Sequence, residues 1–221
     1  MPKDTYGIAP KTAIILAAGS SIRYRGVAKQ LLPVGDETIL ERMIRQCRQH
    51  RYTPVVFTAN DWIIKALDGY NCDHWLPPKS DTVCDTIYHM SGFWGPRTAI
   101  LLGDVIYSQD AMARIMGCKA DFMTFGNMWE VFALSFAGKN AKAVRRAVGV
   151  AIETPPHKVR TIFMSYSYIS RLVKQDKYML SKIDTFDYID DYTNDIDTHN
   201  DYKNFLIEVV KRKRLDDRKP K

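Results

Sequence analysis

Short apolar runs alternate along much of the chain with segments in which apolar residues recur at helical spacing. Three of the runs, residues 13–16, 54–58 and 98–102, are four or five residues long and rich in aliphatic side chains. Because such runs have no polar side, they predict strands that are buried on both faces. Residues 121–125 and 130–136 are predicted to form two further strands.

The clearest helical pattern follows the first strand and its loop. Apolar residues keep the 3.6-residue period from residue 39 to residue 50, and Thr38 and Glu41 stand at capping-box spacing. A helix is therefore expected to begin directly after Thr38. Asp110 is predicted to cap a helix that runs to Met116. The full set of further predicted helices covers residues 61–67, 81–90, 110–116, 140–148 and 201–213.

Alternating buried strands and amphipathic helices predict an α/β fold. We expect three α/β/α layers around a mainly parallel, mixed sheet. The chain has no internal repeat and no linker, so residues 1–210 are predicted to form one domain, followed by a basic tail over residues 211–221. Ligands bind such sheets at the carboxyl ends of the strands. Two motifs, at Ala17–Gly19 and Gly103–Asp104, are predicted to lie at those ends.

Composition narrows the class of protein. The 221 residues are 46% hydrophobic and 26% charged, as in an ordinary globular protein. No apolar run approaches the roughly 20 residues that span a bilayer, and residues 1–11 lack the apolar stretch of a signal peptide, so a cytoplasmic location and no membrane partner are expected. The four cysteines form no CxxC pair, which excludes a recognisable zinc knuckle or disulfide framework.

The net charge of +7 is concentrated at one end of the chain. Residues 211–221, KRKRLDDRKPK, hold seven Lys or Arg against two Asp, which leaves a net charge of +5 there. A short basic terminus is usually a solvated segment. Nucleic acid is therefore not the expected partner, although contact of the tail with a polyanion stays open.

The strand at residues 13–16 opens into a loop of small and cationic residues. Small side chains let a ligand approach the backbone, hydroxyls add hydrogen bonds, and the cations attract phosphate, so this loop suits a polyphosphate. It matches neither the Walker A pattern nor the dinucleotide fingerprint. The loop residues concerned are Ala17, Ala18, Gly19, Ser20, Ser21, Arg23, Arg25 and Lys29.

Two acidic motifs lie far from this loop in the sequence. The strand at 98–102 ends at Gly103–Asp104, and a carboxylate there beside a triphosphate would suit a hard divalent cation. Residues 184–201 contain seven Asp, among them Asp195 and Asp197. A run of Asp by itself more often marks a solvated loop than a site.

Three segments together resemble the nucleotidyltransferase superfamily with a GT-A-like fold. They are LAAGSSIRYRGVAKQLLPVG from Leu16, ILLGD ending at Asp104, and DIDT from Asp195. The superfamily includes sugar-phosphate nucleotidyltransferases, phosphocholine-type cytidylyltransferases and molybdenum-cofactor guanylyltransferases. The chain departs from the pattern at Ile22, where a small residue is common, and at Ala28, where Pro usually precedes the lysine.

The resemblance implies roles for individual residues. Arg23, Lys29 and Asp104 would be catalytic, with Arg23 on the triphosphate and Lys29 on the α-phosphate. Asp104 and Asp197 would hold the metal. Asp195 is the runner-up for the second ligand, and Asp201 is expected to cap the last helix. Nucleotide contacts are expected from Leu16, Ala17, Ala18, Gly19, Ser20, Ser21, Thr82 and Gly103. An acceptor region over residues 126–195 would contribute Trp129, Glu130 and Asp195.

The resemblance implies a Mg²⁺-dependent nucleotidyltransferase. It would move a nucleoside monophosphate from an NTP, with CTP or UTP favoured, to a sugar phosphate or phosphoalcohol and release pyrophosphate. Two alternatives stay open at this point. Asp195–Asp197 is formally the DxD motif of a GT-A glycosyltransferase, and the departures at Ile22 and Ala28 would also fit a non-catalytic nucleotide-binding module.

Overall fold

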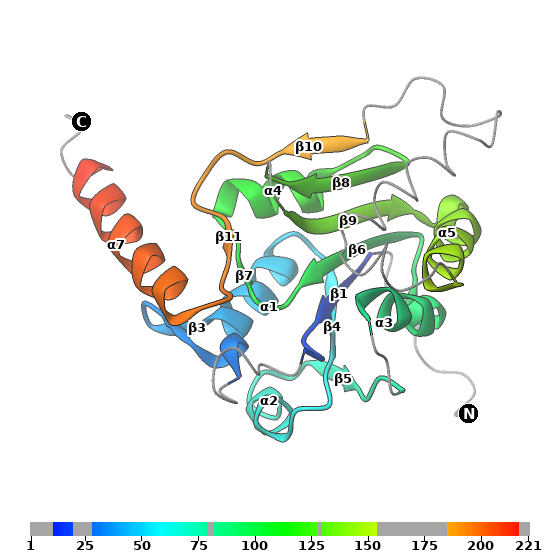
Figure 1. The fold of residues 1–221 in the computed structure, drawn as a ribbon, viewed down its shortest axis with the longest axis horizontal. Coiled ribbons are helices and arrows are strands. Elements are labelled where there is room, and N and C mark those ends of the chain that lie inside the picture. The colour runs from blue at the N-terminus through cyan, green and yellow to red at the C-terminus, as the bar shows by residue number, and fades with distance from the viewer. Residues whose placement is uncertain (1–10, 20–27, 79–81, 128–129, 154–184, 217–221) are drawn as a thin grey trace.

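The computed structural model describes residues 11–19, 28–78, 82–127, 130–153 and 185–216. Its centre is a seven-stranded sheet with the strand order β10-β8-β9-β6-β1-β4-β5 (Figure 1). In chain order these strands are β1 (Thr12–Leu16), β4 (Thr53–Phe57), β5 (Asp73–Trp75), β6 (Arg97–Leu102), β8 (Phe122–Gly126), β9 (Val131–Ala137) and β10 (Phe186–Tyr188).

The sheet is mainly parallel, with one strand reversed. β1 lies parallel to β4 and β6, with Ile14 level with Val55 on one side and with Ile100 on the other. β5 and β10 extend the sheet in parallel with β4 and β8. β9 runs antiparallel between β6 and β8. The predicted mixed sheet is therefore confirmed.

Helices cover both faces of this sheet. The α-helices are α1 (Ile39–Gln49), α2 (Asp61–Leu67), α3 (Val83–His89), α4 (Gln109–Gly117), α5 (Ala141–Glu153) and α7 (His199–Asp216). The short elements are the 3₁₀ turns η2 (Lys29–Leu31), η3 (Met90–Phe93) and η4 (Gly138–Asn140) and the strands β2 (Pro33–Val34), β3 (Glu37–Thr38), β7 (Val105–Ile106) and β11 (Asn194–Asp195).

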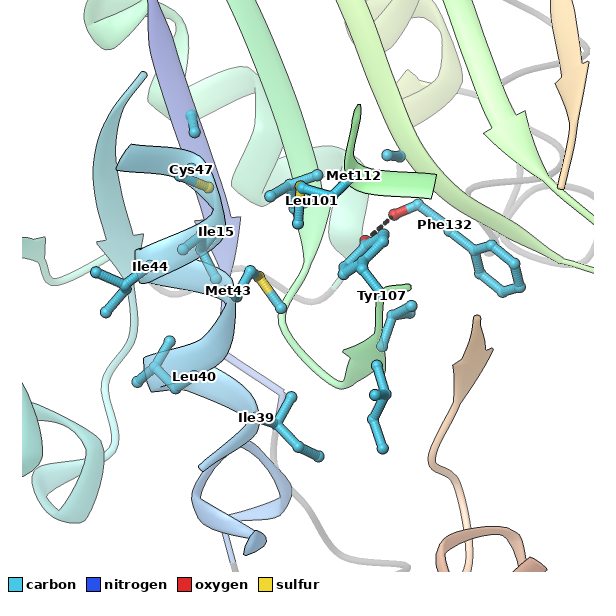
Figure 2. Packing of buried hydrophobic residues seen from close by; sticks show 14 of the residues in the cluster. Ile15, Ile39, Leu40, Met43, Ile44, Cys47, Leu101, Tyr107, Met112 and Phe132 are labelled. Atoms are coloured by element: carbon cyan, nitrogen blue, oxygen red, sulfur yellow. Dashed lines mark hydrogen bonds between the residues drawn. The ribbon is translucent and has the colours of Figure 1, made fainter. Parts of the chain in front are cut away.

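Two apolar clusters form the core, one on each face. Ala13 and Ile15 of β1 pack with α1, α2 and α4, whereas Ile14 and Leu16 pack with α3 and α5. Alternation along a strand thus sends successive side chains into opposite layers, which explains the unbroken apolar run. Figure 2 shows the first cluster, where Met43 of α1 lies near Ile15.

The predicted start of α1 is correct. Thr38 accepts a hydrogen bond from the Glu41 backbone N–H, and the Glu41 carboxylate accepts one from the Thr38 N–H, which completes the capping box. The predicted cap of α4 is wrong. Ser108 caps this helix by accepting from the Ala111 N–H at 2.8 Å, and Asp110 lies inside the first turn. Ser, two residues earlier, was an equally suitable cap residue by type.

The C-terminal segment returns across the body of the protein. After β10, β11 pairs antiparallel with β7, and α7 follows at once (Figure 1). The Tyr202 hydroxyl donates to the Pro33 carbonyl at 2.5 Å, which ties α7 to the β2–β3 hairpin. The predicted basic tail begins inside α7, which continues to Asp216. Within the described ranges, no helix combines the length and the apolar character needed to cross a membrane.

Candidate active site

The ends of β1 and β6 are held together by a backbone contact. The Gly103 N–H donates to the Leu16 carbonyl at 2.9 Å. A Cβ atom on Gly103 would lie 2.5 Å from the same oxygen, so only glycine fits here without a shift of the backbone. The amide of Gly103 is thus used within the fold. Its effect is to place Asp104 beside the loop that follows β1.

The C-terminal segment brings two more carboxylates to this point. The Ile196 N–H donates to the Asp104 carbonyl at 3.1 Å, directly after the β7–β11 pairing. Ile196 is fully buried in the core. Side chains alternate along extended backbone, so Asp195 and Asp197 share the face opposite Ile196. One oxygen from each of Asp104, Asp195 and Asp197 lies within 4.8 Å of the others.

Lys29 lies against this acidic cluster. It is only 6% exposed, and it is the first residue of the 3₁₀ turn η2. Its Nζ lies 2.8 Å from Asp104 Oδ2 and 3.3 Å from Asp197 Oδ1. Three segments that are distant in sequence therefore meet through charged side chains. Lys29, which is predicted to bind phosphate, thus lies in contact with Asp104 and Asp197, which are predicted to bind metal.

The pKa values of Asp195, Glu130 and Lys29 are shifted by burial and by their charged neighbours. Burial, and then the neighbouring charge of Asp104, raise the pKa of Asp195 to about 7, although Lys29 opposes the shift. Burial and the charges of Asp197 and Asp104 also raise the pKa of Glu130. Burial alone would lower the pKa of Lys29, but Asp104 above all raises it. One lysine does not balance this concentration of negative charge.

The donor set fits a hard divalent cation. Mg²⁺ and Mn²⁺ prefer carboxylate oxygens, and three are gathered here. Among the described residues, the buried Oδ1 of Asp195 has no hydrogen-bond partner, which a cation would correct. Asp104, Asp195 and Asp197 are therefore the residues that could hold the metal, which raises Asp195 from runner-up to full member of the set.

The structure brings only some of the predicted site residues together. Lys29, Asp104, Asp195 and Asp197 are in or around the cluster, and Glu130 is close enough for its charge to interact with Asp104 and Asp197. Leu16, Ala17, Ala18 and Gly19 lie at the end of β1, and a Cβ on Gly19 would meet no atom within 4 Å. Outside the described residues lie Ser20, Ser21, Ile22, Arg23 and Trp129.

Two of the predicted residues take part in helix capping. Thr82 caps α3 in a capping box with Asp85, and its hydroxyl also donates to the Asp85 carboxylate at 2.7 Å. The structure thus gives Thr82 a structural role at the start of α3. Asp201 accepts from the Thr198 N–H at 2.6 Å and donates its own N–H to the Thr198 hydroxyl. Thr198 is therefore the cap residue of α7, and Asp201 completes a capping box from inside the first turn, which corrects the prediction that Asp201 itself caps this helix.

Sequence reasoning missed the residues that hold β11 in place. The Asp191 carboxylate accepts from the Ser108 hydroxyl at 2.5 Å and from the Thr193 N–H at 2.6 Å, and the Thr193 hydroxyl accepts from the Ser108 N–H at 3.0 Å. These three residues, which we call the β11 clamp, anchor the segment before Asp195 to the start of α4. The only sequence signal was a Ser before a helix.

A buried tyrosine supports the turn that carries Asp104. The Tyr107 hydroxyl donates to the Phe132 carbonyl at 2.6 Å (Figure 2) and accepts from the Leu102 N–H at 3.1 Å. Tyr107 therefore links the end of β6 to the neighbouring strand β9. A tyrosine in an apolar stretch is usually a core residue, so its position in the sequence does not single it out.

Comparisons with known proteins bear on the family and the fold of this chain. Residues 13–119 match the family described as the MobA-like NTP transferase domain. A comparison with functionally curated proteins gives no significant match in sequence.

Solved structures extend the likeness to nearly the whole chain. A homologue of Mycobacterium tuberculosis Rv0371c from Mycobacterium sp. strain JC1 has a TM-score of 0.62 at 21% identity, covering 92% of this chain and 98% of its own. CTP:phosphocholine cytidylyltransferase from Streptococcus pneumoniae, LicC, has a TM-score of 0.62 at 12% identity, with 91% and 99% covered. M. tuberculosis Rv0371c in complex with manganese has 0.59 at 19%, with 89% and 98% covered.

These findings bear on the sequence-based predictions at two levels. The solved structures share the fold, so the predicted GT-A-like nucleotidyltransferase fold is confirmed. The family match over residues 13–119 confirms the predicted resemblance to nucleotidyltransferases and the enzyme class that it implies. The match ends before Asp195, so it does not include Asp195 or Asp197. Their position beside Asp104 is known from the structure alone.

Proposed function

We propose that this nucleotidyltransferase uses a divalent metal ion, Mg²⁺, to transfer a nucleoside monophosphate from an NTP to a phosphorylated small molecule. CTP or UTP is the favoured donor, and the acceptor is a sugar phosphate or a phosphoalcohol, so the product is a nucleotide sugar or a nucleotide-linked alcohol. The observation that carries the proposal is the meeting of Lys29 with Asp104, Asp195 and Asp197 beside the loop after β1.

The proposed reaction is a single in-line displacement. A phosphate oxygen of the acceptor forms a bond to the α-phosphorus of the NTP. The bond from the α-phosphorus to the bridging oxygen breaks, and pyrophosphate leaves with that electron pair. A phosphate nucleophile is already ionised near neutral pH, so the site needs no strong general base. Positioning and charge neutralisation then supply the rate enhancement.

The chain's own residues divide these tasks. Arg23 is proposed to contact the triphosphate, and Lys29 the α-phosphate, where negative charge must be neutralised as the two anions meet. The backbone of Ala17, Ala18 and Gly19 lets the phosphates approach closely. Asp104, Asp195 and Asp197 are the proposed metal ligands. A bound Mg²⁺ would supply Lewis-acid polarisation of the phosphate oxygens.

A solved structure of the same fold supports the preference for a cytidine or uridine donor. LicC, which shares the fold, is a CTP:phosphocholine cytidylyltransferase. That protein combines CTP with a phosphoalcohol, which is the pairing proposed here. The charge of Glu130 interacts with those of the acidic cluster, and Glu130, Asp195 and Trp129 are the proposed contacts for the acceptor.

Pyrophosphate release tests the proposal directly. The purified chain is assayed with each of the four NTPs against a panel of sugar phosphates and phosphoalcohols, with Mg²⁺ or Mn²⁺ present. Release is expected with one donor and acceptor pair. Tight NTP binding with no release from any pair would instead support a non-catalytic nucleotide-binding module.

A carboxylate variant connects the activity to the site. Asp104→Asn should lower kcat at least about 100-fold, because it removes a charged metal ligand while its shape is kept. Circular dichroism should show the fold unchanged. Asp110→Asn is the matched control, since Asp110 is an exposed aspartate in the first turn of α4. Normal turnover of Asp104→Asn would contradict the metal assignment.

A further inference from the structure

Lys29 lies where a cation bound to the acidic cluster would compete with it. Its Nζ contacts Asp104 at 2.8 Å and Asp197 at 3.3 Å, and these are two of the three residues that could hold the metal. The lysine is 6% exposed, so its charge is neutralised mainly by these neighbours and not by water. These two ion pairs of Lys29 do not involve the third carboxylate, Asp195, whose buried Oδ1 has no hydrogen-bond partner among the described residues.

The main chain of Lys29 is fixed while its side chain is long. The Leu31 N–H donates to Ala28 and the Leu32 N–H to Lys29 itself, which closes the η2 turn. The backbone of this turn therefore places Lys29 beside the cluster. Four methylene groups still let the ammonium move by several ångströms between neighbouring anions.

We propose that Lys29 is an exchangeable counter-ion of the metal site. A divalent ion takes over Asp104 and Asp197 and displaces the ammonium, which then pairs with the phosphates of the NTP. Metal alone binds weakly, because it must displace a buried cation that gains no new partner. Metal and phosphate together bind synergistically. The metal ion replaces Lys29 as the cation beside the carboxylates, and the phosphate replaces the carboxylates as the anion beside Lys29. The inference deepens the proposed function and rests on it for the phosphate partner alone.

The physical reason is the cost of an unpaired buried charge. Removing the carboxylates from Lys29 without a replacement leaves an ammonium with little access to water, which is strongly unfavourable. A phosphate ligand removes that penalty. By linkage, whatever phosphate adds to the metal affinity, metal adds to the phosphate affinity, typically by about 5–150-fold.

Metal affinity without any nucleotide is the first test. Binding of Mn²⁺ alone is measured by electron paramagnetic resonance for the wild type and for Lys29→Met. The variant is expected to bind Mn²⁺ about tenfold tighter or more, because its cluster lacks the competing charge. Equal or weaker binding by a folded Lys29→Met would overturn the proposal.

A matched control separates competition from a change in net charge. Lys139 forms an ion pair with Asp121 at 2.8 Å, but this pair lies on the exposed surface beside α5. Lys139→Met removes the same charge and the same kind of ion pair away from the cluster. Its Mn²⁺ affinity should equal that of the wild type. A gain as large as that of Lys29→Met would assign the effect to overall charge and count against exchange.

A wild-type measurement keeps the test decisive if Lys29→Met does not fold. Acylation of Lys29 by an amine-reactive reagent is followed by peptide mass spectrometry. Labelling of Lys29 relative to Lys139 should rise when Mn²⁺ is added and fall again when inorganic pyrophosphate is added with it. No change in the ratio at a Mn²⁺ concentration that saturates the protein would overturn the exchange.

These measurements fail separately from the proposed function. The Mn²⁺ titration and the labelling need no turnover, no nucleobase and no acceptor. If pyrophosphate release is absent but Lys29→Met binds Mn²⁺ more tightly, the counter-ion role stands and the transferase proposal fails. If release is present but Lys29→Met binds Mn²⁺ as the wild type does, the transferase proposal stands and the counter-ion role fails.

Discussion

At the scale of single residues, the alternation of Asp195, Ile196 and Asp197 supplies two of the three carboxylates of the acidic cluster. Ile196 is fully buried, and its backbone N–H is bonded to Asp104. The core thus fixes the residue between the two carboxylates, and extended backbone sends both carboxylates to the other side. A one-residue slip would bury the acids and expose the isoleucine, so the register of β11 is strongly specified.

Gly103 is predicted to be intolerant of even one methyl group. Gly103→Ala places a carbon 2.5 Å from the Leu16 carbonyl and should lower the free energy of unfolding by about 1–3 kcal/mol. Urea denaturation measures this change. Gly117→Ala is the control, because a Cβ on Gly117, the last residue of α4, meets no atom within 4 Å. Equal stability of the two variants would count against the close contact.

The pKa of Asp195 predicts a pH dependence of the metal-free protein. Its folded pKa of about 7 is above the ordinary value near 3.9, so the native state binds more protons than the unfolded state between these values. The free energy of unfolding should therefore fall as pH rises from about 4 to 7 through this group.

Removing the ionisable group should remove that part of the dependence. Asp195→Asn, measured by urea denaturation with EDTA present, should show a shallower loss of stability across the same pH range than the wild type. The exposed variant Asp190→Asn should follow the wild type. Identical slopes for Asp195→Asn and the wild type would show that Asp195 is ionised normally.

At the scale of elements, two-residue strands position the candidate site residues, whereas the long strands and helices form the domain core. β7 and β11 have two residues each, yet their pairing joins Asp104 to the C-terminal segment. The long strands and helices were predictable because their apolar patterns are periodic. The pairing of β7 with β11 was not, because two-residue strands have no period and their partners are far apart in sequence.

The same contrast explains which site residues the sequence could identify. Gly103–Asp104 follows an apolar strand, so its position at the sheet edge could be inferred. Asp191, Asp195, Asp197 and Asp201 belong to one acidic run, yet the structure uses them for the clamp, the cluster and a helix cap. Composition alone assigns all of them to a solvated loop. Their separate tasks depend on contacts with residues 83 or more positions earlier in some cases and two or three positions away in others.

The β11 clamp should control the geometry of the cluster without touching it. Asp191→Ala removes the carboxylate that accepts from Ser108 and Thr193. It leaves buried donors unpaired, so the free energy of unfolding should fall by about 1–3 kcal/mol. Mn²⁺ affinity should fall severalfold, since β11 is no longer anchored.

Mn²⁺ titration together with urea denaturation measures both effects of this change. The neighbouring variant Asp190→Ala is the control, since Asp190 is exposed. Unchanged Mn²⁺ affinity in a destabilised Asp191→Ala would restrict the clamp to a role in stability and contradict its role in positioning the metal ligands.

At the scale of the whole molecule, the site joins the two ends of the described chain. The family match covers residues 13–119 and includes Lys29 and Asp104. Asp195 and Asp197 follow much later, and the C-terminal segment that carries them is bonded to β2, α4 and β7. Periodicity predicts the layers of the domain. It does not predict that the last segment folds back onto the first loop.

This closure sets an order of events during synthesis. The contact between Lys29 and Asp197 joins residues 168 positions apart. At about 5–20 residues per second, a ribosome needs roughly 10 to 30 s to travel between them. A growing chain can therefore complete β1, α1 and β6 while Lys29 and Asp104 still lack both later acids. The acidic cluster therefore cannot form until β11 has been synthesised, and a product that stops before β11 lacks Asp195 and Asp197.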